Sequence, residues 1–111
     1  MKASVADLLA RLPGLASAKW PDGERFATAF AHGTMSVELY APRGADPQAP
    51  HAQDELYFIH AGTGLLRIAD TAHPFAPGDA FFVAAHVEHR FAEFSDDFAA
   101  WVVFWGPQGG E

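Results

Sequence analysis

Short runs of alternating apolar and polar residues dominate the chain from about residue 26 onward. Such alternation is typical of β-strands that are buried on one face. Gly, Pro and Asp separate the runs at close intervals, as turns between strands require. The pattern predicts seven strands, at Arg25–Ala31, Thr34–Tyr40, Glu55–His60, Gly64–Ala69, Ala80–Val83, His89–Phe94 and Phe98–Trp105. Seven short strands without an intervening helix indicate an all-β sandwich or barrel.

The N-terminal segment follows a helical pattern instead. Ser4 precedes Asp7 by three residues, which is the signature of a helix N-cap. Apolar residues then recur at helical spacing, at Val5, Leu8, Leu9 and Leu12. Pro13-Gly14 ends the pattern. We therefore predict one short N-terminal helix whose apolar stripe packs against the rest of the domain.

Length and composition favour a single domain. The chain has 111 residues, half of them apolar, and its ten Phe, three Trp and two Tyr supply the bulk for a compact core. We expect an N-terminal helix and loop at residues 1–25, a β-barrel at residues 26–107 as part of the same domain, and a mobile tail at residues 108–111.

Charge and composition limit the classes of partner. The formal charge is −7, and the seven basic residues are scattered singly. Because nucleic acids and anionic membranes require clustered Lys and Arg, we expect neither as a partner. Cysteine is absent, so thiolate metal sites and thiol nucleophiles are excluded. No apolar run has the length of a membrane span or the form of a signal peptide, and we expect a cytoplasmic protein.

Two separated segments carry the candidate chemistry. His51 and Glu55 have the same parity in a predicted strand, so both side chains lie on one face. A distant strand carries His89. Two imidazoles and one carboxylate that converge from separate strands suit one divalent transition metal, namely Zn, Ni, Fe, Mn or Cu.

These segments resemble the two motifs of the cupin superfamily, in particular small stand-alone bacterial cupins. His51, Glu55 and Gly62 match the first motif, in which three residues separate His from Glu and six separate Glu from Gly. Gly78 and His89 match the second motif. The resemblance extends over residues 32 to 107 and implies a double-stranded β-helix, a jelly-roll-like barrel, with His51, Glu55 and His89 as metal ligands.

The chain departs from the family pattern at one ligand position. Many metal-binding cupins have another His two residues before His51, but this chain has Ala49. The resemblance thus supports three ligands and leaves Gln53, His32 or water for the fourth position.

Other polar and aromatic residues receive different predictions. Gln53, Tyr57, His86 and Phe91 are predicted as possible pocket residues. His60 has the opposite parity to Glu55 and is expected to lie off the pocket, and His73, beside Pro74, is expected in an exposed turn.

Three functional hypotheses remain open from the sequence. The first is a metal-dependent enzyme with dioxygenase-, isomerase- or lyase-like chemistry on a small organic molecule. The second is a module that binds a metabolite or ion without turnover. The third is a metal-free structural barrel, in which His51, Glu55 and His89 form a buried polar network. The apolar strands favour a homodimer in each case.

Overall fold

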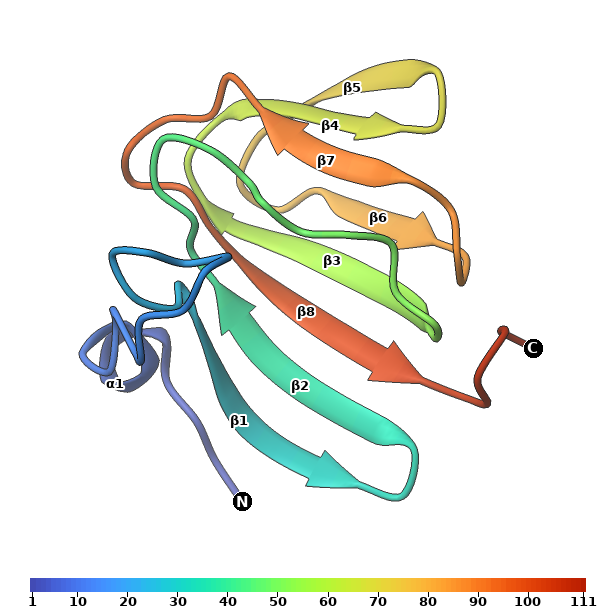
Figure 1. Cartoon of the computed structure of the whole chain (residues 1–111), viewed down its shortest axis with the longest axis horizontal. Helices are drawn as coiled ribbons and strands as arrows, with labels where there is room; N and C mark the ends of the chain where they lie inside the picture. Colours follow the sequence, from blue (N-terminus) through green and yellow to red (C-terminus); the bar gives the residue numbers. More distant parts are fainter.

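The computed structural model of the protein describes residues 1–111 (Figure 1). It contains one helix and eight strands. These are α1 (Val5–Leu9), β1 (Phe26–His32), β2 (Met35–Tyr40), β3 (Asp54–Ala61), β4 (Gly64–Ile68), β5 (Thr71–Phe75), β6 (Ala80–Val83), β7 (His89–Ala92) and β8 (Ala99–Trp105).

The strands form two antiparallel sheets that face each other (Figure 1). The larger sheet has the order β1-β2-β8-β3-β6, and the smaller has the order β5-β4-β7. Strands that are distant in the sequence, such as β2 and β8 or β4 and β7, are thereby hydrogen-bonded neighbours. The fold is the predicted all-β double-stranded β-helix with one short helix.

The main hydrophobic core lies between the two sheets. Leu66, Phe75 and Phe91 of the smaller sheet contribute to it, and all three are almost fully buried. The larger sheet and its connections add Tyr40, Tyr57, Ile59, Val83, Phe98, Ala100 and Val102. Phe91 contacts Phe98 with ring centroids 4.6 Å apart, so aromatic packing joins the two layers.

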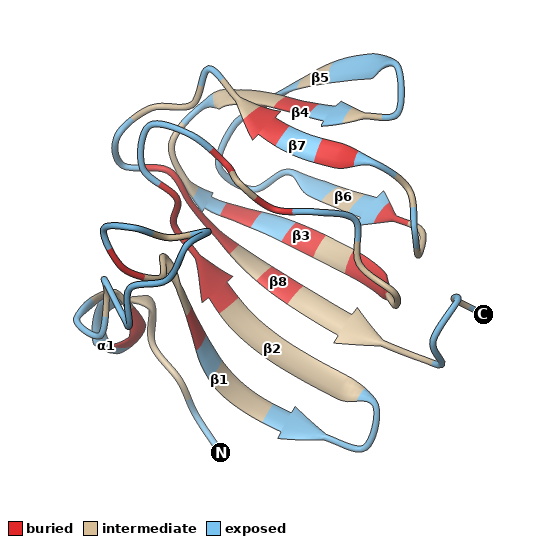
Figure 2. Ribbon diagram, in the orientation of Figure 1, coloured by how far each residue is buried: buried red, intermediate tan, exposed pale blue.

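The inner face of the larger sheet is set by strand alternation. Figure 2 shows buried residues alternating with more exposed ones along most of β3. The inward-facing residues from Glu55 onward are Glu55, Tyr57 and Ile59. Tyr57 pairs with Val102 of β8, which pairs in turn with Glu38 of β2. One face therefore carries side chains from three adjacent strands toward the interior, with polar ones on β2 and β3 and the apolar Val102 of β8 between them.

Helix α1 covers part of the outer face of the larger sheet. The Ser4 side chain accepts a hydrogen bond from the backbone N–H of Asp7 at 3.2 Å, as the sequence predicts for an N-cap. Leu8 is fully buried in a second cluster with Leu39 and Ala99. No helix of the structure is long and apolar enough to cross a membrane.

The structure contains one strand that the sequence analysis missed. His73 lies in β5, pairs with Leu66 and is half-buried, so the expected exposed turn at this residue is wrong. Pro74 argues against a strand because it has no N–H to donate. However, β5 is an edge strand of the smaller sheet, where one missing donor is tolerated.

The C-terminal residues 108–111 lie against the start of β3. The backbone N–H of Gly109 donates to the Ala52 carbonyl at 2.6 Å, and that of Glu111 donates to Asp54 Oδ2 at 3.2 Å. Trp105 Nε1 donates to the Glu111 carboxylate at 3.0 Å. These contacts show where the tail lies, while its mobility stays a prediction.

Candidate metal centre

The fold brings His51, Glu55 and His89 together. Each offers a ligand atom, and these atoms all lie within 4.8 Å of one another. Glu55 points inward from β3 and His89 from β7, so the two sheets supply one residue each. His51 lies in the loop before β3, so the prediction that it shares a strand with Glu55 is wrong; its carbonyl accepts a 2.7 Å hydrogen bond from the His86 N–H. Two imidazoles and one carboxylate are nevertheless close together in the structure.

The contact between Glu55 and His89 requires a positive centre. The Nδ1–H of His89 donates to the Val87 carbonyl at 2.8 Å, because a carbonyl can only accept. A neutral ring then presents a lone pair at Nε2, which lies 2.7 Å from Glu55 Oε1. Two lone pairs at this distance repel, so either a proton or a metal ion must lie between them.

The electrostatics of His89 agree with this requirement. Burial lowers its pKa, but the hydrogen bond and the negative charge of Glu55 more than offset burial, and the pKa is raised overall. In the absence of metal, Glu55 therefore favours the imidazolium form of His89. A divalent ion competes with that proton for the lone pair at Nε2.

The second carboxylate oxygen of Glu55 has no partner. Glu55 is only 1% exposed, and its Oε2 atom is buried without a hydrogen bond. An unpaired buried carboxylate oxygen is costly unless a cation is close to it. A carboxylate with two nearby imidazoles is a donor set that divalent transition metals prefer, so the residues fit such an ion.

Burial favours the neutral form of His51. Burial lowers its pKa despite the opposing charge of Glu55, and the nearby His89 lowers it further. The neutral imidazole is the form that binds metals. The rings of His51 and His89 are 5.7 Å apart between centroids, and the edge of Phe104 packs on His51 at 4.8 Å.

Beside the three predicted residues lies a polar chain that joins Tyr57, a predicted pocket residue, to Gln48 and Asp46, which sequence reasoning missed. Tyr57 Oη lies 3.0 Å from His89 Nε2 and donates to Gln48 Oε1 at 3.1 Å. Gln48 Oε1 also lies 3.3 Å from His51 Nε2. Asp46 accepts from the Gln48 amide at 2.6 Å. Because Asp46 and Gln48 belong to a Pro- and Ala-rich loop without strand periodicity, no sequence signal marked them.

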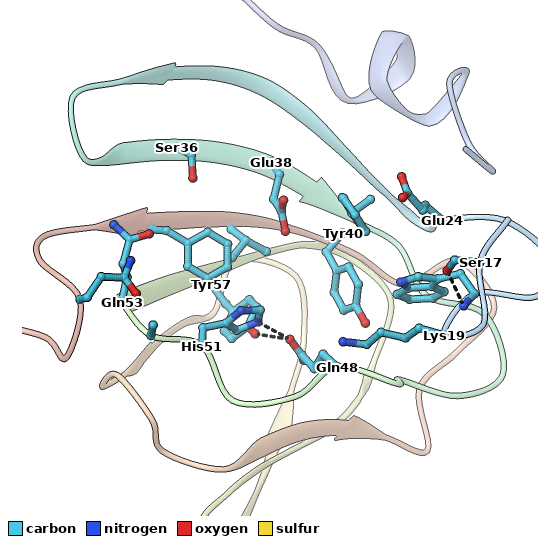
Figure 3. Close-up of a pocket in the computed structure, with 16 residues that line it drawn as sticks. Ser17, Lys19, Glu24, Ser36, Glu38, Tyr40, Gln48, His51, Gln53 and Tyr57 are labelled. Atoms are coloured by element: carbon cyan, nitrogen blue, oxygen red, sulfur yellow. Dashed lines mark hydrogen bonds between the residues drawn. The ribbon is translucent and has the colours of Figure 1, made fainter. Parts of the chain in front are cut away.

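An open cavity of about 570 Å³ adjoins this cluster (Figure 3). Its walls include five aromatic side chains, those of Trp20, Phe26, Tyr40, Tyr57 and Phe104. They also include charged and amide side chains, those of Lys19, Glu24, Glu38, Gln48, Gln53 and Gln108. His51 lies on its wall, and Figure 3 shows Tyr57 and Gln48 next to it. The volume suits a small organic molecule.

Glu38 is a second feature that the sequence did not reveal. It points from β2 into the cavity, where Figure 3 shows its carboxylate between Tyr57 and Tyr40. Burial and the negative charge of Glu55 raise its pKa to about 7. A cavity carboxyl that changes its charge near neutral pH is suited to proton transfer.

The predicted pocket residues divide into two groups. Gln53 and Tyr57 line the cavity, whereas His86 and Phe91 are not among its lining residues. His86 is exposed in a turn with φ of 66°, and Phe91 is 1% exposed within the core. His60 is exposed on the outer face of β3, as its parity predicts.

Comparison with known proteins agrees with this architecture. Residues 36–105 match the family model described as the cupin domain. An uncharacterized protein of Streptomyces coelicolor is 40% identical over 76 residues, which cover 67% of this chain and 72% of that protein.

Solved structures show the same fold at low sequence identity. A cupin 2 conserved barrel domain protein from Salinispora arenicola has a TM-score of 0.62 and 17% identity, over 73% of this chain and 74% of that one. KdgF from Halomonas sp. has a TM-score of 0.65 and 14% identity, over 75% of this chain and 78% of that one. The family match, the two facing sheets and the motif positions together establish that this chain belongs to the cupin domain family.

Proposed function

We propose that this cupin holds one divalent transition metal at His51, Glu55 and His89 and binds a small organic molecule in the adjoining cavity. The observation that carries the proposal is the proximity of one ligand atom from each of the three residues, in a cluster whose glutamate keeps its second carboxylate oxygen buried without a protein partner. Zn, Ni, Fe, Mn and Cu all accept imidazole and carboxylate ligands, and this donor set does not select among them.

Catalysis on the bound molecule is the function that the cavity favours. When bound, such an ion supplies Lewis-acid or oxygen-activating chemistry, as in isomerases, lyases and dioxygenases. The chain contributes the aromatic walls of the cavity, and Glu38 as the group that accepts or returns a substrate proton. Binding without turnover is the alternative, and it would use the same cavity and the same ligands.

The metal content of purified protein tests the proposal. Native protein without an affinity tag is expected to contain near-stoichiometric metal by plasma mass spectrometry. His51→Ala, Glu55→Ala and His89→Ala each remove one donor and are expected to lose most of it. His60→Ala is the matched control, because His60 is an exposed histidine of the outer face and should leave the metal content unchanged.

The outcomes separate the hypotheses. Equal metal content in the native protein and the three ligand variants would place the ion elsewhere on the chain. Absence of metal after reloading with each candidate ion would overturn the proposal and favour the metal-free network of Glu55 and His89. Stabilisation of the metal-loaded protein by a ligand that it does not convert would favour the binding module.

We also propose that the outer face of the larger sheet pairs with a second copy of the chain. One row of paired residues crosses all five strands of this sheet and is entirely apolar, comprising Phe30, Val37, Val103, Leu56 and Phe82. Phe82 is 55% exposed, and Phe58 of the same face is 43% exposed. Because the row carries no charge, two copies can meet there in spite of their net negative charges.

Sedimentation velocity over a concentration series tests this pairing. The native chain is expected to sediment as a dimer, and Phe82→Lys is expected to weaken the dimer at least about 100-fold, because the interface would bury an unpaired ammonium group. Thr71→Lys introduces the same charge at an exposed position of the smaller sheet and should leave the dimer intact. A native chain that is monomeric at every concentration would contradict the proposal.

A further inference from the structure

The proposed metal site has three ligands in the sequence pattern and needs a further donor. Ala49, at the position where many cupins have a histidine, has no donor atom in its side chain and is exposed. His32 ends β1 as an exposed residue and pairs with Met35, away from the cluster. Gln53 Nε2 donates to the carbonyls of Thr34 and Gly106, at 3.0 and 2.9 Å. Neither predicted candidate is oriented toward the site.

Gln48 presents an oxygen to the cluster instead. It is 7% exposed, and its Oε1 atom lies 3.3 Å from His51 Nε2. Two donors that bind one ion at about 2.0–2.2 Å lie roughly 3.0–3.6 Å from each other. The observed separation therefore matches that of two ligands on the same ion.

The orientation of the Gln48 amide is determined by its neighbours. Its Nε2 group donates to Asp46 Oδ2 at 2.6 Å, so the oxygen must face the other way, toward His51 and Tyr57. Asp46 is held in turn by the Tyr40 hydroxyl and by the Phe91 N–H at 2.9 Å. The carbonyl oxygen is thus preorganised as an acceptor at the edge of the site.

Tyr57 is less suited to the same role. Its hydroxyl is 3.0 Å from His89 Nε2, but it donates its proton to Gln48 Oε1 at 3.1 Å. The phenol therefore acts as a hydrogen-bond donor beside the site. An amide oxygen needs no deprotonation before it binds a cation.

We propose that the side-chain carbonyl oxygen of Gln48 is the fourth protein donor to the metal, with Asp46 as the positioning residue that directs it. This inference rests on the proposed metal site and assigns the position that Ala49 leaves without a ligand. The resulting donor set has two imidazoles, one carboxylate and one amide oxygen. It remains in the range that first-row divalent ions accept.

Co²⁺ titration of the chelator-stripped full chain tests the inference. Gln48→Met keeps a similar side-chain volume and removes the carbonyl. We expect it to bind Co²⁺ at least about tenfold more weakly than the native chain and to change the visible absorption of the bound ion, which reports its donors. Gln53→Met is the matched control, since Gln53 lines the same cavity with its amide directed at Thr34 and Gly106.

The measurement distinguishes this inference from the proposed function. If the native protein binds Co²⁺ and Gln48→Met binds it with the same affinity and spectrum, Gln48 is not a ligand. The proposed three-ligand site would be unaffected by that result. Native protein that binds no Co²⁺ would overturn both. If Gln48→Met fails to fold by circular dichroism, Gln48→Asn replaces it, because the shorter side chain keeps the amide and withdraws the oxygen from the site. The same loss of affinity is expected there.

Discussion

Asp46→Ala is expected to lower the free energy of unfolding by about 3–5 kcal/mol, measured by urea denaturation. Asp46 is 4% exposed and accepts hydrogen bonds from the Tyr40 hydroxyl, the Gln48 backbone and amide, and the Phe91 N–H. Alanine leaves these buried donors without an acceptor and opens a cavity beside the core. The loop that carries Gln48 would lose its hydrogen bond to the Phe91 N–H of β7.

Two further variants test whether the loss of stability arises from the hydrogen bonds of the Asp46 carboxylate. Tyr40→Phe removes one of the donors and is expected to cost about 1–2 kcal/mol. Asp97→Ala removes an exposed carboxylate that accepts from Ser95 and should change stability by less than about 0.5 kcal/mol. A loss below about 1 kcal/mol for Asp46→Ala would mean that water replaces the carboxylate and that the loop is not held there.

Glu38→Gln is expected to stabilise the metal-free protein at alkaline pH by about 2–3 kcal/mol. Burial and the charge of Glu55 raise the pKa of Glu38 from 4.5 to about 7. Between these two values the folded state binds more protons than the unfolded state, so native stability falls as pH rises through this window. Glutamine has no proton to lose and removes that part of the pH dependence.

Urea denaturation of chelator-treated protein at about pH 5 and pH 8 measures this effect. The variant and the native chain should differ little at the lower pH and diverge at the higher one. Glu88→Gln, at an exposed position, controls for the loss of one negative charge. Equal stabilisation by Glu38→Gln at both pH values would contradict ionisation of Glu38 as the cause.

Strand periodicity in the sequence predicted the all-β fold and the inward direction of Glu55. The motif resemblance selected His51 and His89 as its partners, and the structure places all three side chains close together, although His51 reaches the cluster from a loop and not from a strand. Ser4 and the apolar residues after it predicted helix α1, which the structure confirms. These features depend on the spacing of residues along the chain, which can be read from the sequence.

Tertiary structure decided the features that depend on contacts between distant segments. Strand β5 forms in spite of Pro74 because an edge strand tolerates a missing donor. Glu38 has a raised pKa because β2 and β8 bring it into the same interior as Glu55. Gln48 faces His51 only because Asp46 is held from β2 and β7. An irregular loop has no period from which such an orientation can be predicted, since its conformation is set by the hydrogen bonds that it finds in the folded chain.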